Sequence, residues 1–167
     1  MSLQRTPLHQ LCRDGGGRMV PFAGWEMPVQ FSGLIQEHKA VREQLGMFDI
    51  SHMGVLRLEG PDPKSALQQL VPSDLHRIGP GEATYTVLLN ESGGIRDDLI
   101  VYDCGAIDAE CGALVVVINA ACADSDTAWI RERMEPAGLT VTDIKKAGVL
   151  LALQGPQAIP MLEQLSG

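Results

Sequence analysis

The chain has 167 residues, of which 45% are hydrophobic and 20% charged, a balance typical of a folded globular domain with a sizeable core. Its formal net charge of −8 argues against a basic surface, so we expect neither nucleic acid nor an anionic membrane as a partner. The longest apolar run is too short to span a bilayer, and the first residues lack the apolar core of a secretory signal. We therefore predict a cytoplasmic protein.

The cysteines are scattered along the chain. Structural zinc sites usually pair their ligands two to four residues apart, and no such pair occurs here. In a reducing compartment the expectation is free thiols and no metal site. The four cysteines are Cys12, Cys104, Cys111 and Cys122.

The first third of the chain predicts two helices and an irregular connection. Residues 8–12 form a short helix that ends at the following glycines, and residues 34–45 form an amphipathic helix. Between them, residues 19–28 are apolar but interrupted by prolines, which remove backbone donors. We expect a packed loop there that plugs a core with Phe22 and Trp25, in preference to a direct ligand contact.

A histidine precedes the central part of the chain. His52 is a possible base, but no Ser or Cys nucleophile motif accompanies it, so a hydrogen-bonded structural role is favoured. A strand over 55–58, a helix over 64–71 and a connector over 72–81 follow.

A hairpin then carries the most unusual feature of the sequence. Residues 83–89 and 95–102 are rich in β-branched, aromatic and aliphatic side chains, and a turn cluster with two glycines joins them. The adjacent carboxylates Asp97 and Asp98 interrupt the second strand. Side chains alternate along a strand, which puts Asp97 with Ile95, Leu99 and Val101, and Asp98 with Ile100 and Tyr102.

Both faces of that strand are apolar further along, so one of the two carboxylates must point toward the covered side of the sheet. A buried carboxylate needs a partner or a ligand. Asp97 or Asp98 could accept hydrogen bonds from the N–H groups of a nitrogen compound and stabilise positive charge, or could be purely structural. The spacing leaves both readings open.

The last third predicts an irregular loop over 103–112 and an apolar strand over 113–119, whose continuous hydrophobic run suits a central strand. Asn119, at the end of that strand, either satisfies loop backbone or contacts a ligand. A helix over 124–134 comes next.

Two strands, over 139–144 and 147–153, then precede a helix whose apolar stripe is Ile159, Leu162 and Leu165. The order of elements predicts an α+β fold of mainly antiparallel sheets with flanking helices. The chain stops directly after that helix, which suggests a piece of something longer.

Phosphate-binding loops and the GxSxG, HExxH and calcium-loop motifs are absent. Several long segments instead resemble, in order, the N-terminal part of the aminomethyltransferase family, the T proteins of the glycine cleavage system. The resemblance covers nearly the whole chain. The segments are MVPFAGWEMPVQF, EHKAVREQLGMFDISHMG, ATYTVLLNESGGIRDDLIVY, VINAACADSDTAWI and LALQGPQA.

The resemblance implies a three-domain fold that binds tetrahydrofolate. It also implies a reaction in which the aminomethyl group on the lipoyl arm of H protein loses ammonia and passes to folate as 5,10-methylenetetrahydrofolate. The aspartate beside the reactive folate nitrogens matches Asp98, with Asp97 as second choice. The positions that match residues near the pterin ring are Met53, Tyr85, Tyr102, Val117 and Asn119.

By the same resemblance, residues 1–52 and 142–167 belong to a first, discontinuous domain and residues 53–141 to a second. Family chains are longer, and their remaining folate contacts lie beyond residue 167, so we expect this piece to be inactive alone. Two sister families remain as alternatives: folate-binding proteins of iron–sulfur maintenance, and the folate-linked part of dimethylglycine or sarcosine oxidases. Neither would depend on H protein.

Overall fold

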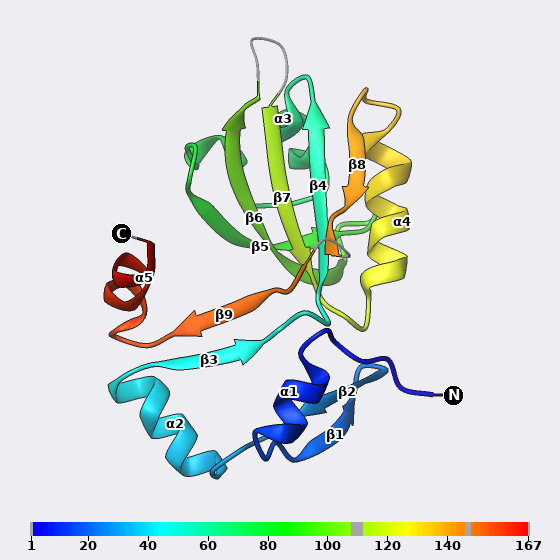
Figure 1. Ribbon diagram of the computed structural model, residues 1–167. Helices are drawn as coiled ribbons and strands as arrows, with labels where there is room; N and C mark the ends of the chain where they lie inside the picture. Colours follow the sequence, from blue (N-terminus) through cyan, green and yellow to red (C-terminus); the bar gives the residue numbers. More distant parts are fainter. Residues whose placement is uncertain (1, 108–111, 146–147, 167) are drawn as a thin grey trace. The chain divides into compact units, whose positions relative to one another are not determined.

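The computed structural model describes residues 2–107, 112–145 and 148–166, and the chain forms two compact units (Figure 1). One comprises residues 1–52 and 148–167, and the other comprises residues 53–147. The second boundary lies later than the one expected at 141/142. The reason is that β8 (Thr140–Asp143), which spans the expected boundary, pairs along its length with a strand of the second unit.

The second unit is built on a five-stranded sheet in which every pairing is antiparallel. The strand order is β5-β6-β7-β4-β8, so β7 is central, as its continuous apolar run predicts. The remaining strands are β4 (Gly54–Gly60), β5 (Ala83–Leu89), β6 (Ile95–Ala106) and β7 (Gly112–Ile118).

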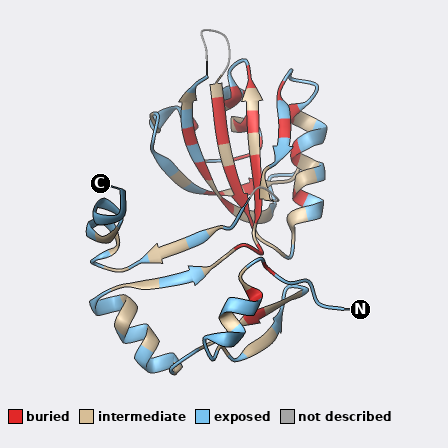
Figure 2. Ribbon diagram, in the orientation of Figure 1, coloured by how far each residue is buried: buried red, intermediate tan, exposed pale blue. Residues whose placement is uncertain are grey.

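One face of this sheet carries the hydrophobic core, and the buried residues gather along β4, β6, β7 and α4 (Figure 2). Helices α3 (Pro63–Gln68) and α4 (Ala123–Met134) and the 3₁₀ helix η1 (Leu75–Arg77) supply the other half of the core. Fully burying such an aliphatic side chain stabilises the fold by roughly 1.5–3 kcal/mol. Fully buried members include Leu58, Leu67, Val101, Leu114 and Ile130.

The first unit has little core of its own. Its described residues form two two-stranded antiparallel sheets, β1-β2 and β3-β9, and three helices. Helices α2 and α5 have no buried residue, and Ile35 and Leu165 are each 76% exposed. The elements are α1 (His9–Asp14), β1 (Met19–Phe22), β2 (Trp25–Pro28), α2 (Leu34–Glu43), β3 (Gly46–Asp49), β9 (Leu151–Gln154) and α5 (Ala158–Ser166).

The prediction of a packed loop over 19–28 is wrong. This segment is a hairpin whose two-residue turn, Ala23-Gly24, has positive φ at both positions, the turn that two twisted strands require. A two-stranded ribbon tolerates prolines because each strand keeps one unpaired edge. Phe22 is 57% exposed and meets the ring of the buried His52 edge-on, with 5.6 Å between centroids.

Two other predictions need correction. Residues 46–49 form a strand where only a crossing was expected, and β6 continues through residues 103–106, which were assigned to a loop. A register shift between Asp103 and Gly105 lets β6 continue, and Gly105 takes a φ of 78° there. Of the rest of that expected loop, residues 108–111 lie outside the described part of the chain, Cys111 among them. Cys12, Cys104 and Cys122 are free thiols.

Among the described residues, no helix is long and apolar enough to cross a membrane.

An ion pair holds the end of β6 against α3. The Lys64 Nζ atom lies 2.7 Å from Asp103 Oδ2, and Asp103 is only 5% exposed. Burial acts to raise the pKa of Asp103, but the hydrogen bonds from Lys64 and from the Gly105 N–H hold this pKa below its usual value. The pair therefore stabilises the fold at neutral pH, and this contribution is lost as the pH falls through the folded-state pKa.

We predict that Asp103→Asn lowers the free energy of unfolding at pH 7 by roughly 3 kcal/mol, because Lys64 loses its buried partner. The difference from the unsubstituted chain should shrink as the pH falls below about 4. Urea unfolding measures both effects. Glu59→Gln is the matched control, because the Arg57–Glu59 pair is 43% and 33% exposed and should contribute at most about 1 kcal/mol. Equal losses in the two variants would contradict the assignment.

Candidate functional site

Strand β6 sends its two adjacent carboxylates to opposite faces of the sheet. Asp97 lies on the side of the buried Leu99 and Val101, and Asp98 lies on the opposite, open face with Tyr102. Both aspartates are half-buried. The expectation that one carboxylate would point toward the covered side is met by Asp97.

The alternation breaks just before this pair. Leu88 pairs with Asp97 but Leu89 pairs with Ile95, so Arg96 is the extra residue of a bulge. A bulge re-aims side chains, and here it allows Arg96 to lie on the covered side, where its Nε is 3.7 Å from Asp126 Oδ1. Ile95, which was expected on the Asp97 face, is 68% exposed for the same reason.

Asn119 joins the two carboxylates. Its side-chain Nδ2 donates to Asp97 Oδ1 at 2.9 Å, to Asp98 Oδ1 at 3.1 Å and to the Asp98 carbonyl at 3.2 Å. Its backbone N–H donates to Asp97 Oδ2 at 3.3 Å. The Asn119 amide therefore satisfies two side-chain carboxylates and one backbone carbonyl at the end of β7, and its contact with a ligand stays a prediction.

The open face around Asp98 gathers the other residues that the resemblance singles out. Tyr85 and Val117 both pair with Ile100, from β5 and β7, so these side chains form a row across three strands. Asp98 and Tyr102 flank Ile100 along β6. Met53 directly precedes Gly54, the partner of Ile118, and so lies beside Asn119 at the same end of the sheet.

Two tyrosines on this face remain accessible, with Tyr85 66% and Tyr102 41% exposed. The Tyr85 hydroxyl forms a hydrogen bond with Asp98, and this bond raises the pKa of Tyr85, with smaller contributions from burial and from the charges of Asp98 and Asp97. An aromatic surface next to a carboxylate suits a flat ring that carries N–H groups.

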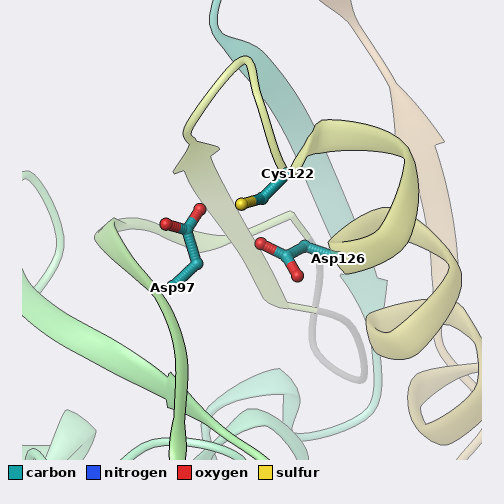
Figure 3. A group of neighbouring side chains, drawn as sticks. All are labelled: Asp97, Cys122 and Asp126. Atoms are coloured by element: carbon teal, nitrogen blue, oxygen red, sulfur yellow. The ribbon is translucent and has the colours of Figure 1, made fainter. Parts of the chain in front are cut away.

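On the covered side, three side chains converge on one point (Figure 3). The ligand-type atoms of Asp97, Cys122 and Asp126 all lie within 4.8 Å of one another. Burial, the hydrogen bond with Asp97 and the charge of Asp97 raise the pKa of Asp126 to about 6, although Arg96 acts in the opposite direction. Burial and the charges of Asp97 and Asp126 also raise the pKa of the Cys122 thiol.

The Trp129 ring holds Arg96 beside this cluster, because the guanidinium groups of Arg96 and Arg133 both stack on it. The Arg96 guanidinium lies 4.4 Å and that of Arg133 lies 3.1 Å from the centre of the Trp129 ring. Trp129 is itself anchored, because its indole N–H donates to the Leu89 carbonyl at 3.1 Å. Arg96 therefore provides a fixed positive charge next to Asp126.

The covered cluster was missed when the sequence was read alone, although one signal was present. Asp126 is spaced four residues from Ile130 and eight from Met134, both buried, so a carboxylate stands on the apolar stripe of α4. An acidic first turn is ordinary in a helix because it complements the helix dipole, an explanation that fits the exposed Asp124 but not the buried Asp126.

Comparison with known proteins identifies the family to which this fold belongs. Residues 8–167 match the model of the family described as "GCVT N-terminal domain". The chain belongs to this family.

Its relatives agree with that assignment. An aminomethyltransferase from Parasynechococcus marenigrum (strain WH8102) is 88% identical over the whole chain, and one from Synechococcus sp. (strain CC9902) is 86% identical over 98% of it. The chain covers 46% and 45% of these two proteins, so it spans less than half the length of the curated relatives it matches. The crystal structure of the glycine cleavage system aminomethyltransferase T from Bartonella henselae superposes with a TM-score of 0.85 at 38% identity. That match covers 98% of this chain and 44% of the other. The α+β fold and its family are thereby confirmed.

We predict that Asp126→Asn changes the pH dependence of stability. A folded-state pKa near 6 exceeds the usual aspartate value, so Asp126 contributes stability that is present below about pH 4 and lost as the pH rises through 6. Relative to the unsubstituted chain, the variant should gain about 2 kcal/mol in free energy of unfolding between pH 4 and 7.5. Urea titrations at both pH values measure it. Asp124→Asn is the control. A difference in free energy of unfolding between D126N and the unsubstituted chain that stays constant from pH 4 to 7.5 would refute the prediction.

Proposed function

We propose that this chain forms the tetrahydrofolate-binding face of an aminomethyltransferase of glycine cleavage. The observation that carries the proposal is the Asp98 carboxylate, held by the Asn119 amide on an open sheet face beside two accessible tyrosines. The names of the relatives support the transferase class.

In the proposed reaction the substrate is an aminomethyl group on the lipoyl arm of H protein. The carbon–nitrogen bond breaks to release ammonia, the carbon–sulfur bond breaks to leave the lipoyl arm as a free thiol, and the carbon forms bonds to N5 and N10 of tetrahydrofolate to give 5,10-methylenetetrahydrofolate. Asp98 would accept a hydrogen bond from a folate N–H and thereby orient the reacting nitrogen. As positive charge develops on the transferring group, the same carboxylate would stabilise it or take up the proton.

Asp98 is favoured over Asp97 for this role because of where each carboxylate lies. Asp97 is turned to the covered side and is engaged with Asn119 and Asp126. Asp98 shares the open face with Tyr85 and Tyr102, where a substrate can reach it. Met53 and Val117 border this face and would contact the pterin ring.

We test this in a full-length protein in which the chain replaces the matching segment of the Parasynechococcus relative, referred to below as the test protein. Asp98→Asn should lower folate-dependent transfer at least about 100-fold, because the group that meets the developing charge is removed. Asp97→Asn should lower it less. Ammonia release and methylenetetrahydrofolate formation measure the rate, with lipoylated H protein as donor.

Asp124→Asn is the control for loss of an exposed carboxylate, and thermal unfolding shows whether each variant is folded. Full turnover in a folded Asp98→Asn protein would refute the role of Asp98. Folate binding without turnover of H protein in the unsubstituted test protein would instead favour a sister family that binds folate for another purpose.

Tyr85 provides a second test, on binding alone. Tyr85→Ala should weaken the binding of 5-formyltetrahydrofolate to the test protein by roughly 3- to 10-fold, because the aromatic surface is lost. Tyr85→Phe should have a smaller effect, since it keeps the ring and removes only the hydroxyl group that meets Asp98. Isothermal titration calorimetry measures the affinity. Phe22→Ala is the control, an exposed aromatic of the first unit, and an equal loss in that variant would contradict a site at Tyr85.

A further inference from the structure

Asp126 is the most deeply buried charged side chain among the described residues, with 1% of its surface exposed. Its Oδ1 atom lies 3.4 Å from the Ser125 hydroxyl and 3.7 Å from Arg96 Nε. Within the described part of the chain, its Oδ2 atom has no hydrogen-bond donor. Such a carboxyl is satisfied when it carries a proton of its own and donates it to a neighbouring acceptor.

The acceptor within reach is Asp97. Carboxylate oxygens of Asp126 and Asp97 lie within 4.8 Å of each other, and two neighbouring carboxyl groups can share a hydrogen bond only when one of them is protonated. Asp126 is the more deeply buried of the two, so burial favours the neutral form there. Asp97 then stays ionised and can accept from Asn119 as well as from Asp126.

A continuous chain of contacts runs from there through the sheet. The Asp126 carboxyl lies beside that of Asp97, Asp97 accepts from both the backbone and the side chain of Asn119, and Asn119 Nδ2 reaches Asp98 Oδ1 at 3.1 Å. The first of these residues lies on the core side and the last on the open face. Each link also fixes which way the next group points, because an amide nitrogen must face the carboxylates.

We propose that Asp126 is a positioning residue for the site: it anchors Asp97 from the core side and thereby sets the orientation of Asn119 and of the Asp98 carboxylate. The proposal rests on the proposed function in one respect, that Asp98 is the group that meets the substrate.

A metal ion at the Asp97, Cys122 and Asp126 cluster is the competing reading, and two observations favour the proton. Metals bind the thiolate, whereas burial and the neighbouring carboxylates raise the pKa of the Cys122 thiol. The Arg96 guanidinium, held against Trp129, already provides positive charge next to Asp126.

Among the described residues, the charged and titratable groups that face Asp126 come from β6 and from the residue that precedes α4. Arg96 and Asp97 belong to β6, and Cys122 belongs to the segment before α4. Arg96 opposes protonation of Asp126, and Asp97 favours it. As the pH rises through about 6, Asp126 loses its proton and the bond to Asp97 with it, so the order of the Asn119 amide should change there.

The experiment uses three variants of the test protein. Asp126→Ala removes the anchor and should lower kcat by roughly 10- to 100-fold, with the KM for tetrahydrofolate changed by less than about threefold. Asp126→Asn keeps a donor toward Asp97 and should retain kcat within about threefold. Asp124→Ala, in the same helical turn but exposed, should equal the unsubstituted protein.

A second readout does not depend on turnover. In the unsubstituted protein the side-chain ¹⁵N–H signals of Asn119 should titrate with a midpoint near pH 6, and in D126N they should not. A chelator present throughout should change neither result, and loss of the titration on chelation would overturn the proposal in favour of a metal.

The possible failures can be told apart. If the unsubstituted protein turns over and Asp126→Ala matches Asp124→Ala, the inference is overturned while the proposed function stands. If the unsubstituted protein shows no transfer at all, the proposed function fails, and the Asn119 titration alone decides whether Asp126 sets the orientation of the amide.

Discussion

The geometry of the site depends on one amide that serves two carboxylates. Asp97 and Asp98 are neighbours on one strand, so they must point to opposite faces, and each needs a donor. Asn119 meets both needs from the end of β7, because its side chain bonds to both carboxylates while its backbone N–H bonds to Asp97. The relative position of β6 and β7 is thereby fixed at the end of the sheet where the site lies. A substitution of Asn119 would change both faces at once.

On the covered side of the sheet, the charges of Asp97, Asp126 and Arg96 must be balanced. Asp97 and Asp126 would repel each other if both were ionised, and a proton on Asp126 together with the Arg96 guanidinium relieves that repulsion. The bulge at Arg96 brings the cation to the covered side, and Trp129 holds it there. An irregularity of the strand and an aromatic side chain of the helix therefore serve the same purpose: they allow carboxylates to lie at the margin of an apolar core.

The sequence predicts the features set by local pattern. The hairpin over 83–102, the central β7 and the opposite orientations of Asp97 and Asp98 follow from alternation and turn residues. What it misses depends on long-range pairing: the strand over 46–49 pairs with residues 151–154, and the prolines of 19–28 are tolerated because their ribbon is only two strands wide. The role of Asp126 is missed for the same reason. An acidic first turn is ordinary in a helix, and only the packing of α4 against the sheet makes one of its carboxylates a core residue.

The two faces of the sheet contribute different properties to the site. The orientation of Asp98 is set from the core side, by residues of β6, β7 and α4 that all belong to the second unit. The open face of the same sheet keeps its tyrosines accessible in this chain, which spans less than half the length of its relatives. Under the proposed function, the geometry of the Asp98 carboxylate and the affinity for substrate therefore have separate physical sources. The carboxylate is preorganised by half-buried hydrogen bonds within one unit, whereas affinity grows with the surface that encloses the substrate.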